Sequence, residues 1–199
     1  MQRRVNAKSI VVLATVLASP CTAVVGDEAR PDRIVITYEE PKNPAHRPIY
    51  EALKAHGALE KFKGIFSPFR LPADLPMTIK GCDGVSNAWY QRPGMTICYE
   101  YVADILDTLP KGPTPIGGIT PMDALLGQFF YVVAHEMGHA MFDILNIPLF
   151  GRPEDAADQF SAYMMLQLGK DEARRLITGA AYSYNNYIRN PQVLSLIHI

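Results

Sequence analysis

Residues 135–139 read His-Glu-Met-Gly-His and lie within a long apolar stretch, residues 121–145, which predicts a buried helix. In a helix, residues four apart lie on one face, so the imidazoles of His135 and His139 can bind one metal ion. Zinc with three protein ligands keeps a fourth position for water, and Glu136 would accept a proton from that water as it attacks a polarised carbonyl. The motif predicts a hydrolytic zinc site, and the alternative is a buried helix with two hydrogen-bonded histidines.

The third metal ligand has to come from outside the motif. The metzincin pattern requires glycine three residues and histidine six residues after the second motif histidine, where this chain has Phe142 and Leu145. A carboxylate is therefore expected. Glu154 and Asp158 lie four residues apart at the start of a further predicted helix and share one face, whereas Asp155 points away and is expected to be solvated.

Two alternatives remain open for these acidic residues. Asp143, one turn after His139, is a second candidate for the ligand role, for supporting a ligand, or for binding loop amides. Glu154 and Asp155 would also favour a helix N-terminus without any metal. His46 and His56 are expected to be ordinary surface or capping residues.

The pattern H-E-x-x-H followed by E-x-x-x-D resembles that of the gluzincins. The resemblance implies that Glu154 is the third zinc ligand and that Asp158 orients His135 through a hydrogen bond. A narrower resemblance, over residues 33–190, is to a bacterial family of zincin-like metallopeptidases of otherwise unknown function. It is carried by the segments 82–90, 97–100, 135–139 and 154–158.

This resemblance implies a single α+β zincin-like domain, residues 30–193, with a small N-terminal sheet and an active-site helix. It also implies Zn²⁺ as cofactor and a peptide or protein as substrate. The alternatives are a catalytically inactive zincin-like domain that binds a peptide or protein, and a purely structural zinc domain. Glu136 argues against both, because neither needs a carboxylate at that position.

The pattern of strand-forming residues predicts a first strand at 33–38 and two further strands at 75–82 and 95–98, the latter two joined through residues 87–94. Helices are expected at 49–62 and 99–109. In zincin folds a sheet edge beside the active-site helix pairs with substrate, so one of these three strands is expected to line the cleft. Tyr182, Tyr184 and Tyr187 are candidates for stabilising an oxyanion.

Residues 1–26 have the pattern of a signal peptide, with three basic residues before an apolar run at 9–19 and cleavage expected after Ala23 or Gly26. The protein is therefore expected to be exported, to the periplasm or the medium, with no membrane span in its mature form. Cys21 suggests a lipoprotein, but Pro20 directly before it fits that signal poorly.

Cys82 and Cys98 remain after such cleavage and are expected to form a disulfide, since an oxidising compartment favours pairing; two buried thiols are the alternative. The net charge of −1 and the lack of a basic cluster give no reason to expect nucleic-acid binding. Residues 194–199 resemble a reading frame of a transposon-end sequencing adapter. We expect this tail, with His198, to be non-native and the domain to be truncated before it. Nothing in the sequence indicates the oligomeric state.

Overall fold

The computed structural model describes residues 33–115 and 117–189 of the protein. The predicted signal peptide (1–26) and the tail at 194–199, including His198, lie outside these residues. None of the described helices combines the length and apolarity needed to cross a membrane.

The described part is one α+β domain that contains a four-stranded sheet with strand order β1-β2-β4-β3. The strands are β1 (Ile34–Tyr38), β2 (Leu75–Lys80), β3 (Ala88–Gln91) and β4 (Gly94–Cys98). β1, β2 and β4 are parallel, and β3 pairs antiparallel with β4 at the edge. Alternate residues of β2 and β4 are fully buried in the core, among them Met77, Ile79 and Ile97.

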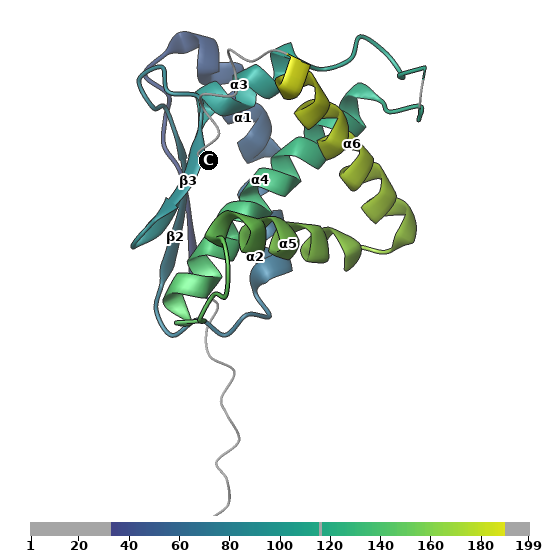
Figure 1. The fold of residues 1–199 in the computed structure, drawn as a ribbon. Coiled ribbons are helices and arrows are strands. Elements are labelled where there is room, and N and C mark those ends of the chain that lie inside the picture. The colour runs from purple at the N-terminus through teal and green to yellow at the C-terminus, as the bar shows by residue number, and fades with distance from the viewer. Residues whose placement is uncertain (1–32, 116, 190–199) are drawn as a thin grey trace, which may run out of the picture. The chain divides into compact units, whose positions relative to one another are not determined.

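Six α-helices and one short 3-10 helix, η1 (Pro44–His46), complete the described fold. The helices are α1 (Arg47–Ala55), α2 (Ala58–Phe66), α3 (Tyr99–Asp107), α4 (Pro121–Ile144), α5 (Pro153–Leu166) and α6 (Lys170–Arg189). Figure 1 shows α4 between the sheet and the helices α5 and α6. Because neighbours surround it, α4 is buried along much of its length, as its apolar sequence predicts.

Local sequence features define both ends of α4. Thr120 is the N-cap residue; its side chain accepts a hydrogen bond from the Asp123 amide, and Asp123 bonds back to the Thr120 amide, while Pro121 occupies the first turn. Asn146, just past the helix, has a left-handed backbone with φ of 51°. The chain therefore reverses direction directly after α4, so the short loop before α5 can return Glu154 towards His139.

Two expectations about local structure were wrong. The helix expected at 49–62 is two helices, because Gly57 between them has a left-handed backbone with φ of 57°. Residues 87–94, expected only to connect two strands, contain β3. His46 occupies the N-cap position of α1, one of the two roles expected for it, although its side chain makes no capping hydrogen bond; it is only 7% exposed, and its ring packs beside Tyr99.

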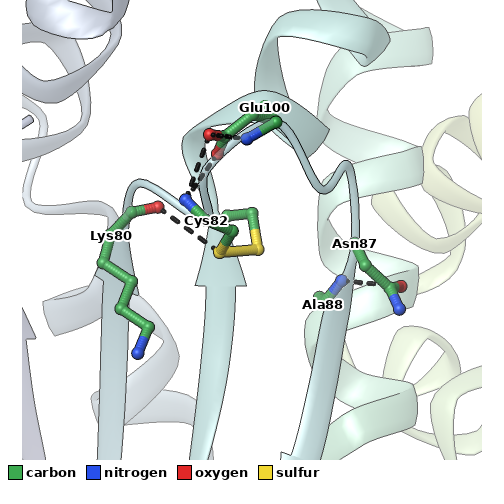
Figure 2. The surroundings of a disulfide bond; sticks show 7 residues. Lys80, Cys82, Asn87, Ala88 and Glu100 are labelled. Carbon is green, nitrogen blue, oxygen red and sulfur yellow. Dashed lines mark hydrogen bonds between the residues drawn. A yellow bond between two sulfur atoms is a disulfide. The ribbon is translucent and has the colours of Figure 1, made fainter. Parts of the chain in front are cut away.

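Cys82 follows β2 and Cys98 ends β4, and their sulfur atoms lie at disulfide-bonding distance, 2.01 Å apart (Figure 2). Beside them, the Glu100 carboxylate at the start of α3 accepts hydrogen bonds from the amides of Cys82 and Gly84. Burial raises the pKa of Glu100, but hydrogen bonds from its own amide and then from those of Gly84 and Cys82 hold this pKa below its usual value. The arrangement fixes the turn that leads into β3, the strand closest to α4 in the sheet.

The backbones of α4 and α6 touch at two glycines. A Cβ atom on Gly179 would lie 1.9 Å from the Asp123 carbonyl oxygen, and one on Gly127 would lie 2.3 Å from that of Leu176. Real side chains do not approach a backbone so closely. The two helices can therefore pack at this distance only with glycine at both positions.

Gly179→Ala is expected to lower the free energy of unfolding by more than about 2 kcal/mol, since the added methyl forces α6 away from α4. The control is Gly64→Ala, in α2, where a Cβ meets nothing within 4 Å. Removing a helical glycine there should stabilise by about 0.5–1 kcal/mol. Urea unfolding of both variants measures the difference, and equal stability of Gly179→Ala and wild type would contradict the close contact.

Candidate metal centre

His135 and His139 lie one turn apart on the same face of α4, as the motif predicts. Their Nε2 atoms are 3.1 Å apart, and the two rings meet edge to face with centroids 4.8 Å apart. Burial, followed by the neighbouring His135, lowers the pKa of His139. A lowered pKa favours the neutral imidazole, which is the form that binds a metal ion.

The third group, Glu154, comes from the first turn of α5. Its Oε2 atom lies 3.1 Å from His135 Nε2 and 3.4 Å from His139 Nε2. α5 approaches α4 at Gly138, where a Cβ would already lie 3.2 Å from the Ala157 backbone. The motif glycine therefore leaves the space that α5 needs to bring Glu154 to the histidines.

These three donor atoms fit a tetrahedral metal site. Ligands bound at 2.0–2.1 Å with tetrahedral angles are separated by about 3.3 Å. The observed separations of 3.1, 3.1 and 3.4 Å are close to that value. Two imidazoles and one carboxylate also form a donor set typical of catalytic zinc. His135, His139 and Glu154 are thus the residues of the described chain best placed to hold such an ion.

Asp158 lies one turn further along α5, and its Oδ1 atom is 2.8 Å from His135 Nδ1. A proton shared between these atoms leaves Nε2 of His135 unprotonated and facing Glu154. The hydroxyl of Tyr131 donates to the same Asp158 oxygen, and burial with this hydrogen bond raises the pKa of Tyr131. Sequence reasoning missed Tyr131, although it lies one turn before His135 on the same helix face.

Glu136 turns towards β3 and is only 9% exposed. Its Oε2 atom accepts a hydrogen bond of 2.7 Å from the backbone amide of Tyr90. Burial raises the pKa of Glu136 to about 7. A cation bound nearby would lower this pKa by favouring the charged carboxylate. The hydrogen bond from Tyr90 thus fixes the orientation of a carboxylate that can exchange a proton near neutral pH.

Asp143 lies in a separate set of contacts near the end of α4. Its carboxylate accepts hydrogen bonds from Arg92 Nη2 at 2.7 Å, from Arg92 Nε at 2.8 Å and from the Tyr90 hydroxyl at 2.6 Å. Arg92, and then Tyr90, lower the pKa of Asp143 to about 2. Asp143 thus joins the β3–β4 hairpin to α4, and it is not one of the three groups that converge at the histidines.

A cavity of about 880 Å³ opens over these groups. It is lined by residues of α3, α4, α5 and β3, and Asp155 reaches it as an exposed side chain. β3 is thus the strand beside the cleft, whereas the sequence reasoning expected one of the strands at 33–38, 75–82 and 95–98 there and did not predict β3. Among the three tyrosine candidates Tyr184 lines the cavity and its ring packs edge to face on Tyr131, whereas the side chain of Tyr187 lies outside the described residues.

Comparison with known proteins adds one family. A family model described as "Putative metallopeptidase" matches residues 38–194. No curated protein and no solved structure matches the chain.

Proposed function

The chain belongs to this putative metallopeptidase family, and from that premise we propose that it is a zinc-dependent hydrolase of peptide bonds. The observation that carries the proposal is the convergence of His135, His139 and Glu154, with donor atoms 3.1–3.4 Å apart, in the same cavity as Glu136. Zinc in this site would polarise the scissile carbonyl and make a water molecule more acidic.

Glu136 is assigned the proton transfers. It accepts the proton of the attacking water and then delivers it to the nitrogen of the departing amine. The Tyr90 amide, 2.7 Å from Glu136 Oε2, fixes the orientation of the carboxylate. Asp158 and Tyr131 act differently, because they hold the His135 ring through its Nδ1 atom.

The substrate is proposed to be an extended peptide bound along β3. This strand lies at the edge of the sheet, pairs only with β4 among the described strands, and lines the cavity. An edge strand can accept a further strand through its backbone groups. The Tyr90 amide faces Glu136, which places that edge directly beside the group proposed to move the proton.

We expect the purified protein to bind one zinc ion per chain and to cleave members of a peptide library, with cleavage lost on chelation and restored by zinc. Mass spectrometry of the library detects the new termini. A protein that binds zinc and retains library peptides without cleaving them would be an inactive binding domain instead. Zinc binding with neither activity nor peptide affinity, and unfolding on chelation, would indicate a structural site.

A further inference from the structure

One end of the cavity is formed by α3 and the first half of α4, away from Asp143. Gln128 precedes His135 by seven residues, which places it about 10 Å along the helix from His135 and about 16 Å from His139. β4 leads directly into α3, and its end pairs with Ala88 at the start of β3. Figure 2 shows Glu100 of α3 at the same end of the sheet as Asn87 and Ala88. This end of the cavity therefore lies beyond the proposed reaction centre.

Gln128 is a buried polar residue in this part of the wall. It is 2% exposed and lines the cavity, and its amide nitrogen donates a 2.6 Å hydrogen bond to the Tyr101 hydroxyl. Its oxygen, Oε1, is buried and has no hydrogen-bond partner among the described residues. Buried acceptors without a partner are rare and costly, so a donor supplied by a ligand would satisfy this atom.

The second group at this end is the Asp104 carboxylate. Tyr101 and Asp104 are three residues apart on α3, so they share one face, and both line the cavity. In the part of the chain that the structure describes, no basic side chain forms an ion pair with Asp104. Two residues that line this end of the cavity thus carry hydrogen-bond acceptors, namely the neutral amide oxygen of Gln128 and the negative carboxylate of Asp104.

We propose that Gln128 and Asp104 form a specificity subsite for a basic side chain, lysine or arginine, of the peptide cleaved at the metal centre. The inference rests on the proposed peptidase function. A cationic side chain carries several donors and no acceptor, which matches the two oxygens. Among the described residues, Arg152 is the only lysine or arginine that lines the cavity, and its Nε lies 4.0 Å from Asp155.

The spacing sets the position of the basic residue in the substrate. An extended peptide advances about 3.3 Å per residue, so the 10 Å between His135 and Gln128 corresponds to about three residues. A long lysine or arginine side chain can also cover part of this distance by extending along the cavity towards Gln128. Bonds cleaved two or three residues from a basic residue are therefore the expected products.

The test uses two peptide pools that differ only in one fixed position, lysine in one and glutamine in the other. The zinc-loaded protein should cleave the lysine pool about tenfold faster, measured as kcat/KM, at bonds two or three residues from the lysine. Asp104→Asn should reduce this lysine-to-glutamine ratio by about tenfold. Gln128→Met, which keeps the volume but removes the acceptor, should reduce the ratio in the same direction.

Asp107→Asn is the matched control, because Asp107 lies on the same helix but is exposed and does not line the cavity. It should leave the ratio unchanged. Equal cleavage of both pools by wild type, or an unchanged ratio in a folded Asp104→Asn, would overturn the subsite. If neither pool is cleaved, the proposed hydrolase fails, and selective retention of the lysine pool in an equilibrium binding assay decides the subsite separately.

Discussion

Glu136→Gln is expected to lower kcat for peptide hydrolysis by at least about a hundredfold, because it removes the base while keeping the shape of the side chain. At 1.36 kcal/mol per factor of ten, this loss corresponds to a barrier higher by about 3 kcal/mol or more. A glutamine can still accept the hydrogen bond that the Tyr90 amide now donates to Glu136 Oε2. The proposed zinc ligands are other residues, so zinc content and peptide binding should persist.

The control for this variant is Glu51→Gln, the same chemical change at an exposed position of α1. Zinc content and thermal unfolding of both variants should equal those of wild type. Cleavage by wild type that survives Glu136→Gln undiminished would exclude the role given to Glu136. Peptide binding without turnover in either form would instead support the inactive binding domain.

The parts of the site that lie within one helix could be predicted from the sequence. The spacing of His135 and His139 follows from helix geometry alone, and the apolar surroundings of the motif predict its burial. The spacing of Glu154 and Asp158 places both on one helix face, and their separate roles follow only from the resemblance to the gluzincin pattern. Their roles at the metal remain predictions, although the structure brings both beside His135.

The contacts made by β3 and the β3–β4 hairpin were not predicted. Tyr90 meets Glu136 only because β3 forms, and the four residues of β3 lie within a segment that reads as a turn. Short strands are decided by packing and pairing more than by propensity. Asp143 was considered as a ligand because of its distance from His139 along the helix, but its hydrogen bonds to Arg92 and Tyr90 come from the folded hairpin.

Gln128 illustrates the same limit for specificity. In the sequence it is one polar residue in an apolar helix, and its spacing of seven residues from His135 places both on one helix face without indicating what Gln128 contacts. The role proposed for Gln128 depends on α3, because the Tyr101 hydroxyl on that helix accepts a hydrogen bond from the amide nitrogen of Gln128. The amide oxygen has no partner among the described residues. Substrate preference is therefore a property of the assembled cavity, whereas the reaction type is indicated by a few residues of one helix.

Glu154→Ala is expected to weaken zinc binding by more than about a hundredfold, since loss of a direct ligand exceeds the 10–100-fold typical of losing a residue that only supports one. Asp158→Asn should fall in that intermediate range, because Asp158 contacts His135 Nδ1 rather than the three converging donor atoms. Asp143→Asn should bind zinc like wild type, since its carboxylate oxygens bond to Arg92 and Tyr90. Competition with a chromophoric chelator measures all three affinities. Full zinc binding by Glu154→Ala combined with loss in Asp143→Asn would show that Asp143, not Glu154, is the third ligand.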